Sequence, residues 1–232
     1  MRAPKENSQA IKSFLLDVSD YHKTLDKNDS LFEPGDNIQY LYMVTSGKIV
    51  LSKPLTDGRE FALRICKKGD LIGESTLFSN HGTKHILHAT AHRKSSVAGI
   101  HKEHITNLLQ NNDKLALYLI NEISQNALRD QTKLIDLVMH GKKGALYSTL
   151  IRLANSYGQQ QNGNIFIKIK LTNQELANFC GTSRENINRS LSELRKDRII
   201  SIENKHIMIH DIDFLKEELN CEGCPITLCS IH

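Results

Sequence analysis

The stretch LTNQELANFCGTSRENINRSLSELRK, residues 171–196, contains two helix starts separated by a glycine. Thr172 is followed three residues later by Glu175, which is the pattern of a capping box at the start of a helix. Residues 182–185 (TSRE) repeat this spacing, and Gly181 stands between the two segments, where a residue without a side chain permits a sharp turn. The pattern predicts two short helices joined by a glycine turn, which is a helix-turn-helix unit.

The second predicted helix carries polar side chains suited to reading DNA. In helix-turn-helix proteins the N-terminal residues of this helix meet base edges in the major groove. Arginine donates two hydrogen bonds to guanine, and glutamate accepts one from the cytosine amino group. The candidate contact residues are Thr182, Ser183, Arg184, Glu185, Asn188 and Arg189. The candidates for phosphate contacts are Lys170, Arg195, Lys196 and Arg198.

A simpler interpretation of these residues stays open. Glu185 could serve only to cap its helix, and the arginines could face water. The following stretch RIISIENKHIMIH, residues 198–210, favours DNA binding, because two short strand-like runs around Asn204-Lys205 predict a β-hairpin wing.

Before this unit, residues 113–138 have a helical period. Apolar residues recur at alternating steps of three and four, which is typical of a coiled-coil seam. The seam consists of Ile120, Ile123, Ala127, Leu134 and Leu137, with Asp130 in register. About 26 helical residues extend roughly 39 Å, so we expect the helix to pair with a second copy, although it could also pack on its own domain. Gly141 and Gly144 are expected to end or bend it.

Residues 37–100 read as β-structure. Short alternating runs are separated by turn signals about every 11 to 13 residues, which predicts a small barrel or sandwich. The signals are Pro34-Gly35, Ser46-Gly47, Asp57-Gly58, Lys68-Gly69 and Gly82. The predicted fold class is therefore α+β, with an N-terminal β-roll of the cupin type, a long dimerisation helix and a C-terminal winged helix-turn-helix.

Composition limits the class of protein. The 232 residues carry a formal net charge of +4, which is compatible with nucleic-acid binding. No apolar run is long enough for a membrane span or a signal peptide, so we expect a cytoplasmic protein without a membrane partner. No nucleophile–base constellation is visible, so an enzyme is not expected. Cytoplasmic thiols stay reduced, and clustered cysteines therefore indicate a metal or redox site.

Three of the five cysteines, Cys221, Cys224 and Cys229, lie within the last twelve residues. Their C-x2-C-x4-C spacing allows the thiolates to share one soft metal centre, and Cys224-Pro225 is typical of iron–sulfur binding runs. Zinc or an iron–sulfur cluster would require a fourth ligand, whereas a thiol–disulfide switch would need only two cysteines.

One carboxylate of the long helix has unusual surroundings. Asp136 stands in the apolar run 134–139, and a carboxylate that is buried there needs a partner. It could instead face water, and Asp130, in the register of the seam, is the competing carboxylate of this helix. Cys66 and Cys180 are expected to be small buried apolar residues, which is the usual environment of a free cysteine.

The order β-roll, long helix and winged helix-turn-helix resembles the cyclic-AMP receptor protein/FNR superfamily of bacterial transcription regulators over nearly the whole chain. GESTLF (73–78) and TSRENINRSL (182–191) look like two of its motifs. The resemblance implies a homodimer that uses Arg184, Glu185 and Arg189 to read inverted repeats of TGTGA-like half-sites in double-stranded DNA, with RNA polymerase as a partner. Lys84-His85-Ile86 replaces the Arg-Ser pair that clamps a cyclic phosphate, so a cyclic nucleotide is not expected.

The tail is similar to that of a narrower group, the FNR-type oxygen sensors of Gram-positive bacilli, whose cluster cysteines are C-terminal. The segment LIDLVMHGKKGALYSTLIRL (134–153) also resembles that group. This implies an oxygen-responsive regulator with a [4Fe-4S] cluster held by Cys221, Cys224, Cys229 and Asp136. The expected domains are a sensor-type β-roll (1–112), a dimerisation helix (113–140), a DNA-binding domain (141–214) and a cluster-binding tail (215–232).

Overall fold

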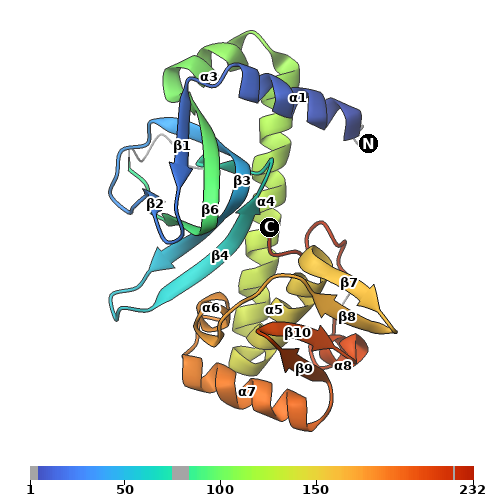
Figure 1. Ribbon diagram of the computed structural model, residues 1–232. Helices are drawn as coiled ribbons and strands as arrows, with labels where there is room; N and C mark the ends of the chain where they lie inside the picture. Colours follow the sequence, from blue (N-terminus) through green and yellow to red (C-terminus); the bar gives the residue numbers. More distant parts are fainter. Residues whose placement is uncertain (1–4, 75–83, 222) are drawn as a thin grey trace. The chain divides into compact units, whose positions relative to one another are not determined.

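The computed structural model describes residues 5–74, 84–221 and 223–232 (Figure 1). Contacts divide the chain into two compact units. One unit contains Met1–Lys53 and Ile65–Asn126, and the other contains Pro54–Arg64 and Ala127–His232. Among the described residues, no helix combines the length and apolar character needed to cross a bilayer.

The first unit is built on an antiparallel sheet, which confirms the predicted β-roll (Figure 1). The strands of this sheet are β1 (Tyr21–Leu25), β2 (Ser30–Phe32), β3 (Tyr40–Pro54), β4 (Glu60–Lys67), β5 (Leu71–Ile72) and β6 (His88–His101), and the hairpin segment Pro54–Arg64 is counted with the second unit. The strand order is β1-β6-β3-β4, with β2 paired to β6 and β5 to β3. Apolar side chains from β2, β3 and β6 form its core, which includes Val44, Ile49 and Ala89.

One turn signal marks a bulge instead of a turn. Gly47 lies inside β3, with φ +84°, where the register of β3 against β6 shifts. A Cβ at this position would lie 2.2 Å from Ser95 Oγ, so only glycine fits the close approach of the two strands. The prediction of a turn at Ser46-Gly47 was wrong for this reason. The Asp57-Gly58 hairpin between β3 and β4 is confirmed, and Gly82 and most of GESTLF lie outside the described residues.

Among the described residues, the helices that complete or leave this unit are α1 (Lys5–Asp17), α3 (Lys102–Gln110) and α4 (Asp113–Met139). Leu15, Ile105 and Leu115, one from each helix, are buried in a second apolar cluster with residues of β3 and β6. The long helix α4 begins at the predicted residue and ends one residue after the predicted end.

The exposed stripe on α4 differs from the predicted seam. It repeats at alternating steps of three and four along the helix and consists of Leu117, Ile120, Ser124, Ala127, Gln131, Leu134 and Val138. Ile120, Ala127 and Leu134 belong to both the exposed stripe and the predicted seam. Ile123, Asp130 and Leu137 are half-buried, and the residue after each of them is exposed instead. The 3-4 period was recognised, but both registers contain apolar residues and only tertiary packing distinguishes them.

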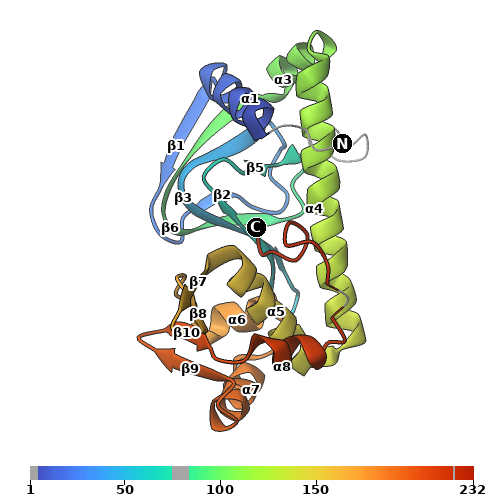
Figure 2. The same ribbon diagram turned by 90° about the vertical axis from the view of Figure 1, so that its right-hand side faces the viewer.

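The second unit contains the winged helix-turn-helix (Figure 2). Its elements are α5 (Gly141–Tyr157), β7 (Gly158–Gln161), β8 (Asn164–Ile167), α6 (Asn173–Phe179), α7 (Arg184–Lys196), β9 (Ile200–Glu203), β10 (His206–Ile209) and α8 (Ile212–Glu217). The predicted wing is β9–β10, with Asn204 and Lys205 both at positive φ in the turn. The strands pair in the order β7-β8-β10-β9.

Three local features of this unit differ from expectation. The hairpin β7–β8 was not predicted, although its turn residues Asn162-Gly163 are a strong hairpin signal. Gly144 does not end a helix but lies inside α5, where a Cβ would meet the side chains of His140 and Leu219. Helix α8 extends to Glu217, beyond the expected domain end at residue 214.

Candidate functional site

The start of α7 is set by Ser183, whose hydroxyl accepts a hydrogen bond from the backbone N–H of Asn186. The prediction of a capping box formed by Thr182 and Glu185 was therefore wrong, because the helix is capped by Ser183, one residue later. Thr182 is only 4% exposed, and its hydroxyl accepts from Asn186 Nδ2 at 3.0 Å. The hydroxyl of Thr182 is therefore engaged inside the unit, and we do not propose Thr182 as a DNA contact. The capping box of Thr172 and Glu175 on α6 is confirmed.

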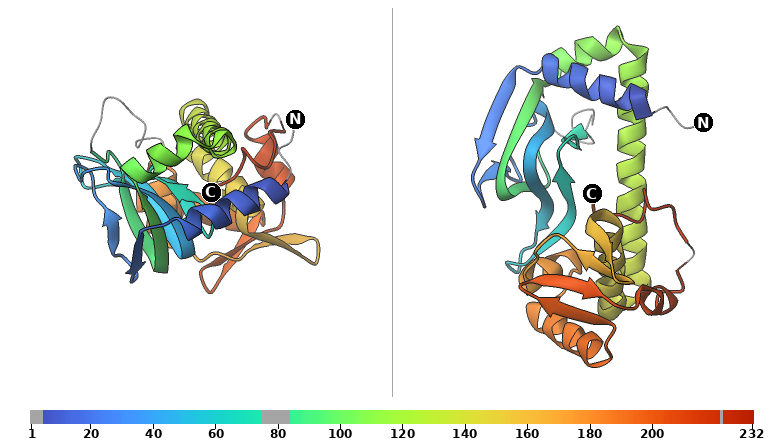
Figure 3. Two further views of the ribbon diagram at one scale, coloured as in Figure 1. Left: turned by 90° about the horizontal axis from the view of Figure 1, so that it is seen from above. Right: turned by 45° about the vertical axis from the view of Figure 1, so that its right-hand side comes forward.

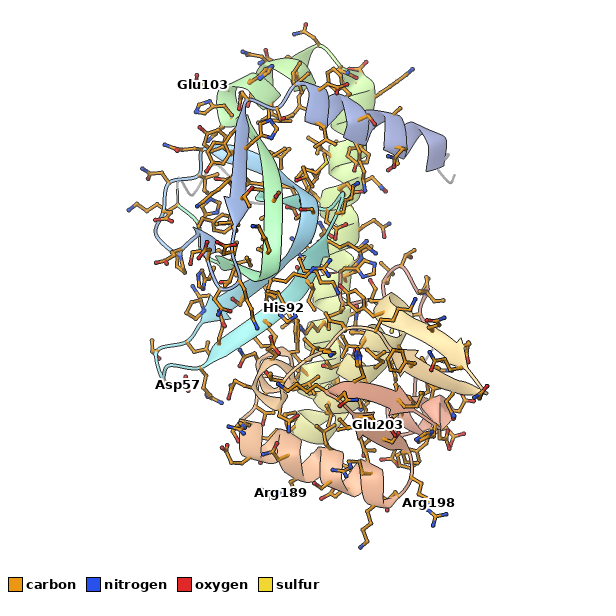
Figure 4. The ribbon with its side chains drawn as sticks, in the orientation of Figure 1. Asp57, His92, Glu103, Arg189, Arg198 and Glu203 are labelled. Carbon is orange, nitrogen blue, oxygen red and sulfur yellow. The ribbon has the colours of Figure 1, made fainter. Side chains whose placement is uncertain are left out.

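The remaining candidate base contacts share one accessible region of α7. Arg184, Glu185, Asn188 and Arg189 are exposed, while Ser183 is half-buried at the cap. Ile187, Leu191 and Leu194 hold the opposite face of the helix in the core of the unit. Figure 4 shows Arg189 projecting from the outer side of α7.

The charge of Glu185 suits a hydrogen-bond acceptor. Its backbone N–H and the hydroxyl of Ser183 lower the pKa of the Glu185 carboxyl, so it stays ionised at neutral pH. Asn188 Oδ1 accepts a hydrogen bond from Asn173 Nδ2 on α6, which fixes its amide relative to the preceding helix. The face therefore presents two guanidinium forks with a carboxylate acceptor between them in sequence.

Basic residues flank this face. Lys170, Arg195, Lys196 and Arg198 are exposed, and Figure 4 shows Arg198 extending away beyond the end of α7. A groove of about 530 Å³ lies between α6, α7 and the wing, with Arg184 and Lys205 among its lining residues. Such cations are suited to phosphate contacts, which position a protein on a duplex.

The C-terminal tail of the second unit runs beside α4 and α5 (Figures 2 and 3). Arg129 Nε on α4 donates to the carbonyl oxygen of Thr227 at 2.8 Å. Asn155 Nδ2 on α5 donates to the carbonyl oxygen of Cys229 at 2.7 Å. The backbone N–H of Ile231 donates to Ser156 Oγ at 2.9 Å. The tail is thus attached to both helices by its backbone, within one chain.

A pocket of about 210 Å³ lies between this tail, α4 and α5. All four predicted metal ligands are among the residues that line it: Cys221, Cys224, Cys229 and Asp136. His140 also lines the pocket, whereas Asp130 does not. Asp136 is therefore the carboxylate that shares a cavity with the thiols.

Asp136 has the partner that a carboxylate in an apolar run requires. Its Oδ2 accepts one hydrogen bond from Ser148 Oγ at 2.6 Å and another from Arg152 Nη2 at 2.8 Å. The Arg152 side chain is 3% exposed and that of Asp136 is 29% exposed. No described residue donates to Oδ1, so one oxygen of this carboxylate is available to a metal.

The three tail cysteines are free thiols, and Cys221 and Cys224 are exposed while Cys229 is half-buried. Burial raises the pKa of the Cys229 thiol; Arg152 opposes this shift, and the nearby Cys221, Asp136 and Cys224 add to it. Several acidic groups thus meet at one place, where a bound cation would relieve their repulsion. In the described part of the chain, no three ligand-type side chains already stand in metal-binding geometry, so the side chains that line the pocket must come closer together to bind a metal.

The other two cysteines behave as predicted. Cys66 and Cys180 are 2% and 3% exposed. The Cys180 thiol donates to Thr149 Oγ1 at 3.5 Å, and burial raises its pKa to about 11. Both are small buried residues, remote in the chain from the tail.

Two polar residues at the pocket were missed by the sequence analysis. Ser148 and Arg152 are 12 and 16 residues from Asp136, and both belong to the buried part of α5. Their spacing of four places them on one helix face. An arginine inside an otherwise apolar helical stretch was the available signal that a buried anion lies opposite.

Comparisons with known proteins agree with this architecture. Residues 144–218 match the Crp-like helix-turn-helix domain, and residues 22–112 match the cyclic nucleotide-binding domain. The Anaerobic regulatory protein of Bacillus subtilis is 41% identical over 218 residues, which cover 94% of this chain and 91% of that protein. The chain belongs to the CRP/FNR family of transcription regulators.

Other CRP/FNR relatives are more distant. The Lactate racemization regulatory protein of Lactiplantibacillus plantarum is 33% identical over 78% of this chain and 82% of its own length. Two solved structures show the same fold. The c-di-GMP responsive global regulator CLP of Xanthomonas campestris has a TM-score of 0.77 and 22% identity, and the match covers 88% of this chain and 99% of that one. FixK2 of Bradyrhizobium japonicum has a TM-score of 0.72 and 17% identity, and the match covers 88% of this chain and 98% of that one. Regulators of this family bind double-stranded DNA as homodimers.

Within the part of the chain that matches the cyclic nucleotide-binding domain, the residues at the predicted clamp position are unusual. His85 is 4% exposed, and its ring stacks on Phe32 with 3.6 Å between centroids. Burial lowers the pKa of His85, so the ring stays neutral. A neutral, stacked imidazole does not offer the charge that a cyclic phosphate needs, and the absence of cyclic-nucleotide binding stays a prediction.

Proposed function

We propose that this regulator is a homodimer that responds to oxygen through a [4Fe-4S] cluster held by Cys221, Cys224, Cys229 and Asp136. The single observation that supports this most is the shared pocket, which these four residues line together. The relative from Bacillus subtilis, named an Anaerobic regulatory protein, supports the same assignment.

The residues at the pocket fit such a group by their chemistry. Thiolates are the usual ligands of iron–sulfur clusters, and Asp136 adds a carboxylate whose Oδ1 accepts no hydrogen bond from the described residues. Hydrogen bonds from Ser148 and Arg152 hold the other oxygen, as is usual for carboxylates that bind metals. When bound, the cluster supplies a cross-link between the tail and α4 that oxygen can break.

The consequence for the protein follows from where the ligands lie. Asp136 belongs to α4, and the three thiols belong to the tail that follows the winged helix-turn-helix. Without the cross-link, the tail is held to α4 and α5 by hydrogen bonds from residues such as Arg129 and Arg152 and by the burial of Ile231. We therefore expect the DNA-binding competent state to be stabilised only while all four ligands are engaged.

For DNA recognition we propose Arg184, Glu185, Asn188 and Arg189 as base contacts. Ser183, at the start of α7, is the proposed contact to the DNA backbone. The proposed site is an inverted repeat of TGTGA-like half-sites, one read by each protomer. A CRP/FNR dimer places its two recognition helices in successive major grooves, about 34 Å apart. RNA polymerase is the proposed protein partner at promoters.

The proposed dimer contact is the exposed stripe of α4. Val138 and Leu117 on this stripe are 79% and 68% exposed, which is unusual for large apolar side chains on a long helix. The stripe has the 3-4 spacing of a coiled coil, so two copies of α4 would bury it against each other.

The test is anaerobic purification of the full-length protein, followed by iron and sulfide analysis and visible absorption. A brown protein with iron and sulfide that bleaches in air supports the proposal. A colourless protein that contains zinc, or one without metal that forms a disulfide in air, would support a regulator of the same fold with a different signal.

A further inference from the structure

Arg152 is the cation beside the candidate ligands, and its burial is nearly complete. Only 2% of this residue is exposed. A guanidinium has five N–H donors, and burying it is costly unless acceptors surround it. The side chain makes five hydrogen bonds, with Ser148 Oγ (3.2 Å), the carbonyl oxygens of Leu228 (3.0 Å) and Ser230 (3.5 Å), Thr132 Oγ1 (3.2 Å) and Asp136 Oδ2 (2.8 Å).

These acceptors belong to three separate segments. Thr132 and Asp136 lie on α4, Ser148 lies on α5 with Arg152 itself, and the two carbonyl oxygens belong to the tail. The tail carbonyls flank Cys229, which lies between them in sequence. One side chain therefore connects the helix that carries Asp136 to the segment that carries the thiols.

In an extension that rests on the proposed function, we propose that Arg152 is a positioning residue that orders both the tail and Asp136 before any metal is bound. By engaging Oδ2 it leaves Oδ1 as the metal-binding oxygen. Its positive charge also offsets the repulsion between Asp136 and nearby thiolates. The planar guanidinium can donate to several acceptors in fixed directions, which a lysine ammonium cannot do. Arg152 itself does not touch the metal in this proposal.

The hydrogen bonds from Arg129 and Asn155 are less able to order the tail. Arg129 and Asn155 each donate to one tail carbonyl, and both bonds are exposed to water. Water can replace an exposed donor at small cost, whereas loss of a buried donor leaves its acceptors unsatisfied. Removal of Arg152 would release two tail carbonyls together and leave Asp136 Oδ2 with the Ser148 hydroxyl as its remaining donor among the described residues.

The experiment measures amide hydrogen exchange in the full-length, reduced protein after the metal has been removed. The reporters are three tail amides with hydrogen-bond acceptors: Leu228 and Cys229 bond to the carbonyl of Pro225, and Ile231 bonds to Ser156. In Arg152→Lys, which keeps the charge but not the fork, exchange at these amides should accelerate at least about tenfold. Lys142→Met, which removes a charge from an exposed position on the same helix, should leave exchange unchanged.

Two further variants guard against loss of folding in Arg152→Lys. Thr132→Val and Ser148→Ala each remove one acceptor of Arg152, and both should produce smaller accelerations of the same amides. Wild-type exchange rates in Arg152→Lys would overturn the proposal. So would equal acceleration in amides of β9 and β10, because the substitution would then act through general unfolding.

Metal retention separates this proposal from the proposed function. If the wild type binds an iron–sulfur cluster, anaerobic removal of its iron by a chelator should be roughly tenfold to a hundredfold faster in Arg152→Lys. An unchanged rate would contradict the positioning role. A wild type without iron or sulfide, whose tail amides still depend on Arg152, would refute the oxygen-sensing function while supporting Arg152 as the residue that orders the tail.

Discussion

Ser148 and Asp136 are joined by a 2.6 Å hydrogen bond between helices α5 and α4. The hydroxyl of Ser148 donates to Oδ2, the same oxygen that accepts from Arg152. The carboxylate is therefore held from one side, and the pocket that contains the tail cysteines lies beside it. This arrangement distinguishes Asp136 from the other acidic residues of α4.

We expect Asp136→Asn to weaken metal retention while preserving the fold. The amide oxygen can still accept from Ser148, but it is a poor substitute for an anionic ligand. The half-life of the cluster against a chelator under argon should fall about tenfold to a hundredfold. Asp130→Asn is the matched control, because Asp130 lies on the same helix outside the pocket. The assignment of Asp136 as the fourth ligand is wrong if Asp130→Asn shortens the half-life of the cluster and Asp136→Asn does not.

A second prediction concerns Lys133, which is buried on α4. Its Nζ donates to the carbonyl oxygens of Ala62 (2.6 Å) and Leu63 (3.0 Å) and lies over the rings of Phe61 and Phe179. Burial lowers the pKa of Lys133 to about 7 from its ordinary 10.5, so the unfolded chain binds an additional proton between these values. Stability should therefore rise with pH above about 7 and fall as pH decreases toward 7.

The measurement is urea unfolding of the metal-free protein at pH 7, 8 and 9, compared with Lys133→Met. The wild type should gain at most about 1.4 kcal/mol per pH unit relative to the variant. Comparing the two proteins cancels the titration of groups that they share. Parallel pH profiles would show that Lys133 does not titrate in this window.

The third prediction separates base contacts from phosphate contacts on α7. Glu185→Ala and Arg189→Ala should each cost about 1–3 kcal/mol of binding free energy at a TGTGA-like site and should relax specificity there. Lys196→Ala should weaken binding to all sequences similarly and reduce the salt slope by about one. Fluorescence anisotropy with specific and scrambled duplexes at several salt concentrations provides both quantities. Equal losses on both duplexes for Glu185→Ala would exclude its role in reading bases.

The fourth prediction concerns the exposed stripe of α4. Ile120→Glu places a charge on the stripe, where two copies would bring equal charges together, so the dimer should dissociate at micromolar concentration. Asn121→Glu adds the same charge at a neighbouring exposed position beside the stripe and should remain dimeric. Sedimentation velocity distinguishes these states. A dimeric Ile120→Glu protein would place the dimer contact elsewhere.

The parts of the fold that follow local patterns were predictable from sequence. The ends of α4 were found to within one residue, because its period of apolar residues is continuous. The wing was found because Asn204-Lys205 interrupts two strand-like runs. Gly47 was misread because positive φ occurs in turns and in bulges alike, and only the approach of Ser95 distinguishes them.

The candidate site was only partly predictable, for a physical reason. Cysteine spacing identified the three thiols, and the apolar surroundings of Asp136 indicated that this carboxylate needs a partner. Arg152, the partner found, acts through contacts between segments distant in sequence, and such contacts leave no local pattern. The choice of Ser183 over Thr182 as the helix cap was equally hidden, since both residues can cap a helix.

Iron and sulfide analysis of the anaerobically purified protein, together with DNA binding by the same sample, tests the proposed cluster most directly. We expect iron and acid-labile sulfide in the wild type, specific DNA binding that is lost in air, and neither metal nor specific binding in Cys224→Ser. A wild type that binds its DNA site equally well with no iron, or a Cys224→Ser variant that binds normally under argon, would contradict it.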